Sequence, residues 1–181
     1  MSAARRQSRF EKGDDVVVMK FGGTSVEDAA AIRRLIGIVQ SRQGAQPVVV
    51  VSALAKVTDQ LLEAGNAAAN GHLGAALATV RSIYVRHEQL ADSLVSGSAY
   101  GALDCELRDE FRALESLLHD LEASRQLDLR SQDRLLGFGE CFSSRLVARR
   151  CARRGSTPPT WTHVIASSPT RVTVRQARSG I

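Results

Sequence analysis

The sequence predicts an α/β fold built on a parallel sheet. Two short apolar runs, at residues 16–19 and 48–51, are rich in β-branched valine, as is typical of buried parallel strands. Apolar side chains recur at helical spacing between the two runs. A strand, a helix and a second strand in this order form a right-handed βαβ unit, so the strands should be parallel. We expect the first of them to be a central strand, covered on both faces.

Length and composition indicate one globular domain. The chain has 181 residues, of which 44% are hydrophobic, enough for a sizeable core. The sequence shows no apolar run near the ~20 residues that span a bilayer and no signal-peptide core, so we expect a cytoplasmic protein without a membrane partner. The four histidines and the three cysteines lack metal-ligand spacing, which predicts no metal site and reduced thiols at Cys105, Cys141 and Cys151.

The charge balance is basic, with a net charge of +5 and a pI near 9.6. Arginine pairs occur at residues 33–34 and 149–150, but aromatic residues are only 4% and no nucleic-acid motif accompanies the pairs. Solvated helix faces explain the pairs more simply, so we expect no nucleic-acid partner. Residues 1–15 are polar and charged without periodicity, which predicts a disordered leader.

A lysine and two glycines follow the first strand. Lys20 stands at its carboxyl end, and Gly22 and Gly23 carry no Cβ, so the backbone could adopt conformations closed to other residues and admit a ligand closely. Thr24 and Ser25 are cap-type residues before a helical pattern. The amides of this turn, the helix start and the lysine ammonium would all face a phosphate. The lysine precedes the glycines, so this is no Walker A loop, and a structural turn is the alternative.

The next two elements are a helix, expected over residues 26–42 from apolar side chains at i, i+3, i+4 and i+7, and the strand at 48–51. The second strand ends in small and hydroxyl residues, and ligands of open α/β sheets bind at such ends. Ser52 and Thr58 are therefore candidate substrate contacts. The alternatives are a small residue for close packing and a helix N-cap.

A long helical excursion follows over residues 60–130, with a break expected at 70–71 and a loop at 96–101. Leucine and phenylalanine keep a spacing of three to four between residues 103 and 121, which indicates a long amphipathic helix. We expect this region to be scaffolding or a partner surface.

A further helix is expected over residues 131–148. Gly137 and Gly139 weaken a helix but allow another backbone to approach, which places Glu140 where packing is tight. A glutamate in such a place should pair with a cation, either a structural arginine or the ammonium of a substrate.

Three segments together resemble the N-terminal signatures of the aspartate kinases, which belong to the amino-acid kinase family. They are residues 20–26 (Lys-Phe-Gly-Gly-Thr-Ser-Val), 50–59 and 138–146, in the family's order. The resemblance covers residues 16–158 as the N-terminal part of the catalytic domain. It implies a three-layer αβα sandwich, truncated here, with the parallel βαβ core and the helical excursion inside it.

In aspartate kinases the γ-phosphoryl group of ATP moves to the β-carboxylate of L-aspartate, on the route to lysine, threonine and methionine. The resemblance implies ATP with Mg²⁺ as the substrate complex, no permanently bound cofactor or metal, and a homo-oligomer at full length. It implies three roles: Lys20 neutralises charge on the transferring phosphoryl group, Gly22, Gly23 and Thr24 hold phosphate oxygens, and Ser52, Thr58 and Glu140 bind aspartate.

The catalytic domain of the family is longer than the chain, so we expect no aspartate kinase activity from the chain alone. One alternative is a non-catalytic fragment that pairs with intact subunits. Another is a different member of the family, such as a glutamate or carbamate kinase, which shares the lysine and glycine turn.

Residues 159–181 are predicted to be the product of a shifted reading frame. The resemblance stops where an Asp-Ala-Arg strand and a Thr-Asp pair are due. Codons shifted by one base force an aspartate at the junction of Trp161 and Thr162, and the junctions that follow permit the remaining residues. The alternative is a divergent C-terminus with short strands around Val164, Val172 and Val174.

Overall fold

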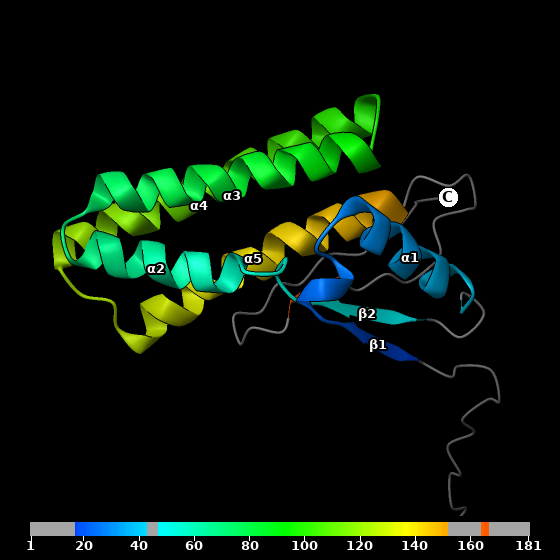
Figure 1. Ribbon diagram of the computed structural model, residues 1–181, viewed down its shortest axis with the longest axis horizontal. Helices are drawn as coiled ribbons and strands as arrows, with labels where there is room; N and C mark the ends of the chain where they lie inside the picture. Colours follow the sequence, from blue (N-terminus) through cyan, green and yellow to red (C-terminus); the bar gives the residue numbers. More distant parts are fainter. Residues whose placement is uncertain (1–16, 43–46, 152–163, 167–181) are drawn as a thin grey trace, which may run out of the picture.

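A computed structural model describes residues 17–42, 47–151 and 164–166 (Figure 1). The leader predicted at 1–15 and most of the tail predicted at 159–181 lie outside the described residues. In chain order the elements are β1 (Val18–Phe21), the 3₁₀ turn η1 (Gly23–Ser25), α1 (Ala29–Gln40), β2 (Val48–Val51), α2 (Val57–Ala69), α3 (Leu73–Leu94), α4 (Ser98–Ser124), α5 (Leu129–Cys151) and β3 (Val164–Ala166).

The described strands form one parallel sheet in the order β1-β2-β3, which confirms the predicted parallel βαβ unit. β2 has the predicted bounds. β1 ends two residues later than predicted, because Lys20 and Phe21 still pair with Val50 and Val51 of β2. β3 lies within the segment that we assign to a shifted reading frame; the origin of that segment is a property of the gene and stays a prediction.

The expectation that β1 is a central strand covered on both faces is wrong for the described sheet. β1 lies at its edge, with Val18 65% exposed and Lys20 exposed, while Met19 and Phe21 pack against the core. Side chains alternate along a strand, so only one face of β1 is covered. α1 and α5 lie on that side of the sheet (Figure 1), as two successive right-handed crossovers require. The described residues thus form a parallel sheet with helices on one of its faces, as the predicted truncated sandwich requires.

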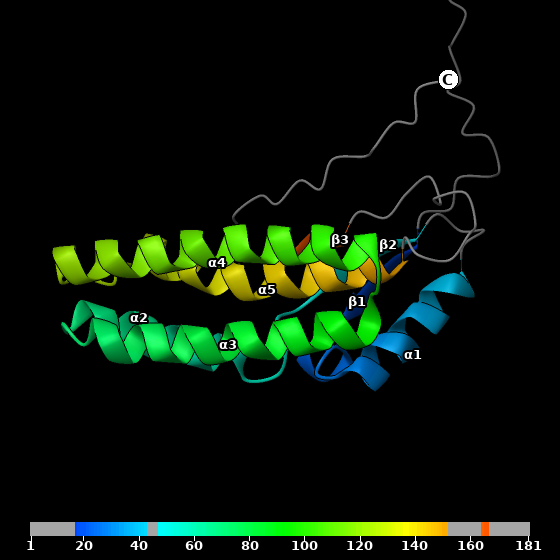
Figure 2. The same ribbon diagram turned by 90° about the horizontal axis from the view of Figure 1, so that it is seen from above.

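The helical excursion predicted at 60–130 is confirmed as the helices α2, α3 and α4, and the further helix predicted at 131–148 is confirmed as α5, which starts two residues earlier and ends three later. They lie side by side, with α4 and α5 in one layer and α2 and α3 in the other (Figure 2). Gly71, with φ +84°, provides the predicted break between α2 and α3. The loop before α4 is shorter than the predicted 96–101, because Gly97 at φ +67° turns the chain and α4 begins at Ser98. The predicted apolar face of α4 is buried.

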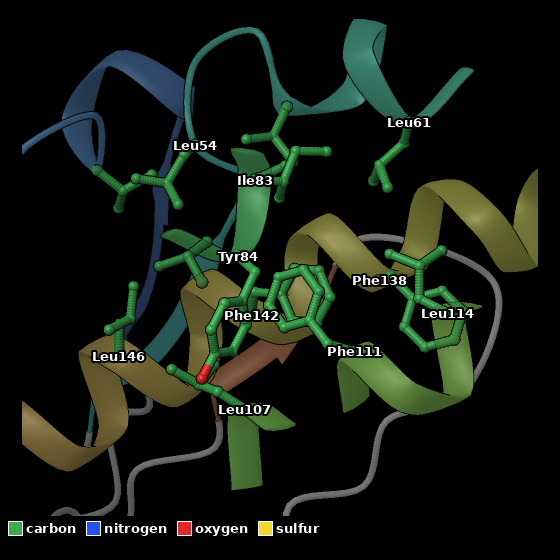
Figure 3. Close-up of a cluster of buried hydrophobic side chains, with 14 of the residues drawn as sticks. Leu54, Leu61, Ile83, Tyr84, Leu107, Phe111, Leu114, Phe138, Phe142 and Leu146 are labelled. Carbon is green, nitrogen blue, oxygen red and sulfur yellow. The ribbon is translucent and has the colours of Figure 1, made fainter. Parts of the chain in front are cut away.

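An aromatic cluster joins three helices of this bundle (Figure 3). The ring of Phe111 in α4 stacks on Phe142 in α5 at 4.0 Å and meets Tyr84 in α3 edge-on at 4.9 Å. His87 lies beside these rings, and its Nδ1 donates to the carbonyl of Ile83 at 2.7 Å. Burial is the main reason that the pKa of His87 falls to about 4.

Helix α5 rests on the turn that follows β2, residues 52–56, which we call the serine turn. A Cβ at Gly139 would lie 2.8 Å from the Cβ of Ala53 and 3.2 Å from side-chain atoms of Val57 and Leu61. The close approach predicted for this helix is therefore confirmed at Gly139. The contact holds α5 against the carboxyl end of the sheet.

The structure bears on the thiols, on metal-ligand clusters and on membrane spans. All three cysteines are free thiols, as expected, and burial raises the pKa of Cys141 and of Cys151 to about 11. No three His, Cys, Asp or Glu side chains gather as a metal site in the described ranges. Within the same ranges, none of the helices is both long and apolar enough to cross a membrane.

Stability in acid should depend on His87. An unfolded histidine has a pKa near 6.5 and the folded one about 4, so the unfolded chain binds the extra proton between these values. The stability that neutral His87 contributes is complete above about pH 6.5 and falls by about 3 kcal/mol as the pH drops to about 4. Urea unfolding across this range measures it, and His87→Gln should remove that part of the loss. His119→Gln, on the exposed face of α4, should keep it. An unchanged pH profile in His87→Gln would contradict the prediction.

Gly139→Ala should destabilise the fold by about 1–3 kcal/mol, because the new Cβ overpacks the contact with Ala53. Gly37→Ala in α1 is the matched control, since a Cβ there meets nothing within 4 Å. Alanine also favours a helix, so Gly37→Ala should stabilise by about 0.5–1 kcal/mol. The urea concentration at the unfolding midpoint, measured for both variants and for the wild type, tests this. If both variants shift the midpoint equally and in the same direction, the prediction is wrong.

Candidate active site

Two turns leave the sheet at the same edge. The first, which we call the glycine turn, comprises residues 22–28 between β1 and α1, and the second is the serine turn. Phe21 pairs with Val51, so both strands end at one level. The amide of Ser52 donates to the carbonyl of Phe21 at 3.0 Å, which keeps the two turns adjacent as they leave the sheet.

Neither glycine of the first turn has an unusual backbone conformation, and Gly23 alone is needed for space. Gly22 has φ −77° and ψ 174°, and the glycines with positive φ among the described residues are Gly71 and Gly97. The predicted special conformation is therefore wrong. A Cβ at Gly23 would lie 3.0 Å from the carbonyl oxygen of Ala53, so the serine turn needs this position to be small. A Cβ at Gly22 would meet nothing, which leaves its backbone open to a ligand.

The sequence suggested that Thr24 or Ser25 caps helix α1, and this prediction is wrong. Both lie in the 3₁₀ turn, and the N-cap of α1 is Asp28, whose side chain accepts from the amide of Ala31 at 2.7 Å. Helix α1 therefore begins at Ala29 and not at the predicted residue 26, so the turn before it is three residues longer than expected. Thr24 is exposed, and its hydroxyl is accessible to a ligand.

The serine turn is held from α5. Ser143 donates through Oγ to the carbonyl of Ser52 at 2.7 Å. Lys56, an exposed residue at φ +69°, is the N-cap position of α2, and Thr58 lies exposed in the first turn of that helix. The N-cap alternative for Thr58 is therefore wrong. A left-handed residue other than glycine is uncommon and often marks a functional turn.

Glu140 lies on α5 between two residues that touch the serine turn. Gly139 packs on Ala53, and Ser143 binds Ser52, so Glu140 is carried to the same place. The residue is half-buried, and its Oε2 is shielded from solvent.

Ion pairs between α5 and α4 help to fix this position. Arg145, one turn further along α5, pairs with Glu106 and Glu110, and Arg149 also pairs with Glu106. The arginine of the third signature is thus engaged with α4.

Lys20 is carried by the same edge but on another face. Its side chain alternates with Phe21, so it starts on the uncovered face of β1 with Val18, and it is exposed. The described contacts therefore bring together the glycine turn, the serine turn and Glu140, and they leave the ammonium of Lys20 in solvent.

A hollow of about 250 Å³ adjoins the glycine turn. Thr24 and Ser25 line it together with Arg34 of α1. Sequence reasoning missed Arg34, because an arginine pair on a helix is typical of a solvated face and no spacing links residue 34 to the turn. A larger hollow of about 310 Å³ lies between α3 and α4 and contains none of the predicted residues. We therefore place the candidate site at the two turns.

This arrangement suits a small anionic ligand that also carries an ammonium group. Open backbone at Gly22 and the hydroxyl of Thr24 offer donors to an anion, and Glu140 offers a carboxylate to a cation. Gly23 and Gly139, the neighbours of Gly22 and Glu140 in the chain, both lie against Ala53.

The sequence matches the amino acid kinase family over residues 15–174. It is 35% identical over 138 residues to aspartokinase 3, chloroplastic, of Arabidopsis thaliana, covering 72% of this chain and 23% of that protein. It is 35% identical over 135 residues to the aspartokinase of Chlamydia trachomatis serovar D, covering 75% of this chain and 27% of that protein.

Solved structures agree in fold. The crystal structure of E. coli aspartokinase III in complex with aspartate and ADP matches with a TM-score of 0.65 and 25% identity, over 75% of this chain and 28% of that one. The chain thus spans between 23% and 28% of the length of these relatives. Over that span it has the fold of the solved aspartokinase, and it belongs to the amino acid kinase family as a relative of the aspartokinases.

Proposed function

We propose that this chain supplies the phosphate-binding and aspartate-binding part of an aspartate kinase site. The observation that carries the proposal is the convergence of the three signature segments around Ala53, with Gly23 on one side and Gly139 on the other. These segments lie far apart in sequence, and glycine at both contact positions lets their backbones pack closely at the edge of the sheet where the strands end. Ligands of parallel sheets bind at this edge.

In the proposed reaction, a β-carboxylate oxygen of aspartate attacks the γ-phosphorus of ATP. The bond from that phosphorus to the bridging oxygen breaks, ADP leaves, and an acyl phosphate forms. A carboxylate is already ionised at neutral pH, so the reaction needs no general base. The protein must hold two anions in line and balance the charge on the transferring group.

We assign the roles as follows. Gly22, Gly23 and Thr24 hold phosphate oxygens, Lys20 balances charge on the transferring group, and Mg²⁺ arrives with the nucleotide. Ser52, Thr58 and Glu140 bind aspartate, with Glu140 facing its ammonium. The structure of E. coli aspartokinase III with aspartate and ADP supports this choice of ligands.

Two other functions stay open. The chain could be a non-catalytic fragment that associates with intact subunits, or it could belong to a relative that phosphorylates glutamate or carbamate. The lysine, threonine and methionine pathways, a homo-oligomeric assembly and a cytoplasmic location also stay predictions. Titration calorimetry with L-aspartate, L-glutamate and ADP·Mg²⁺ distinguishes the substrates, and an assay with and without an intact aspartokinase tests association. Binding of glutamate in preference to aspartate would overturn the proposal.

Lys20→Ala and Glu140→Ala should have separable effects. Loss of the Lys20 ammonium should weaken ATP binding by about tenfold and leave aspartate binding unchanged. Loss of the Glu140 carboxylate should weaken aspartate binding by about tenfold or more and leave ATP unchanged. Calorimetry with each ligand measures both.

Where turnover can be assayed, Lys20→Ala should reduce it more than it weakens aspartate binding, since its charge matters most as transfer proceeds. Lys56→Ala is a control, because Lys56 is also an exposed lysine at the strand ends and has no assigned role. Equal effects of Lys20→Ala and Glu140→Ala on both ligands would remove the role assignment.

A further inference from the structure

One arginine of the helical excursion reaches both turns of the candidate site. Arg86 of α3 donates through Nη1 to the carbonyl of Ala55 at 2.7 Å and through Nη2 to the carbonyl of Glu27 at 3.1 Å. Ala55 belongs to the serine turn and Glu27 to the glycine turn. Arg86 lies 31 residues from the first and 59 from the second in sequence, so the link is tertiary.

The two turns need such a link. The close approach of Gly23 to Ala53 and Ala55 is a steric limit that stops the turns from coming closer and does not hold them together. The hydrogen bond from Ser52 to Phe21 lies at the strand ends, before the turns diverge. The guanidinium of Arg86 adds an attractive contact to both turns beyond that point.

The chemistry of the side chain suits this task. A guanidinium is planar and rigid, with donors on separate nitrogens, so two bonds from one group fix the distance between their acceptors. A lysine ammonium is a compact point charge on a flexible stem and cannot impose the same spacing. Arg86 is half-buried, and hydrogen bonds from a charged donor are stronger than neutral ones.

We propose that Arg86 is a positioning residue, which sets the spacing between the turn that holds phosphate and the turn that holds the amino acid. This inference rests on the proposed function for its consequence. The attacking carboxylate and the γ-phosphorus are held by different turns, and a misplacement of about 1 Å can cost about 100-fold in rate. Helix α3 thus acts on the reaction through Arg86 without touching a reacting atom.

The test compares Arg86→Gln, Arg86→Lys and Arg86→Ala with Arg81→Gln. Arg81 is the matched control, an exposed arginine of the same helix whose guanidinium lies 5.1 Å from the ring centroid of Tyr84. Hydrogen–deuterium exchange on the 181-residue chain reports on peptides that contain each turn. Calorimetry reports the affinity for ADP·Mg²⁺ and for L-aspartate.

We expect the Gln and Lys variants to raise exchange by about tenfold in both turns and to leave α4 unchanged. ADP·Mg²⁺ and L-aspartate should both bind about tenfold more weakly, whereas Glu140→Ala should weaken the binding of aspartate alone. Ethylguanidinium should restore protection of both turns in Arg86→Ala, which a loss of folding would not allow. Arg81→Gln should match the wild type.

Several results would overturn the inference. The first is wild-type exchange at either turn in Arg86→Gln. The second is wild-type exchange and ligand affinity in Arg86→Lys. The third is failure of ethylguanidinium to restore the protection of both turns in Arg86→Ala. If the wild-type chain binds neither ligand, the proposed function fails, while the exchange data still decide whether Arg86 holds the turns.

Discussion

The serine turn is confined between two glycines, and the site depends on this packing. On one side the carbonyl of Ala53 approaches Gly23, and on the other the Cβ of Ala53 approaches Gly139. A side chain larger than hydrogen at either glycine would push the turn out of place, because packed interiors have no spare volume. The relative position of the three signature segments therefore follows from one steric fit, and Ser143 adds a hydrogen bond to it.

The helical bundle gives this fit its rigidity. Helix α5 is fixed against α4 by the stacked rings of Phe111 and Phe142 and by the ion pairs of Arg145. The position of Gly139 against the serine turn is thereby fixed as well. The same core fixes α3 and with it Arg86. The helical bundle, which carries only two of the predicted site residues, Thr58 of α2 and Glu140 of α5, thus determines where the signature segments lie. Because His87 is buried among these rings, the stability of the fold falls in acid. His87 belongs to the aromatic cluster and not to the candidate site.

Much of the fold could be predicted from the sequence, because its signals are local. Uninterrupted valines at 48–51 predicted β2, and the apolar spacing of α1 and α4 predicted helices that bury those faces. The signature segments also pointed to the site. Local patterns could not reveal that β1 lies at the edge of the described sheet, since four apolar residues suit an edge and a centre equally. They also could not show why Gly23 is glycine, because its reason is the carbonyl of a residue 30 positions later.

Arg86 illustrates the limit most clearly. An arginine on a helix is typical of a solvated face, and the role of Arg86 depends on two carbonyl groups that the sequence does not mark. The positive φ of Lys56 could not be predicted from the sequence either, because lysine rarely adopts the left-handed conformation.

The site therefore has a fixed shape and an exposed charge. Its glycines, Ser143 and Arg86 set the backbone, whereas the cationic side chains of Lys20, Arg34 and Lys56 are exposed. Two unit charges 4 Å apart interact by about 1 kcal/mol in water and by about 4 kcal/mol at the effective dielectric of a protein surface. The phosphoryl transfer that we propose joins two anions, so it would benefit from the larger value. A ligand or another layer of protein that displaces water from Lys20 would raise its effect severalfold without moving the backbone, so the chemistry depends on what covers the open face of β1.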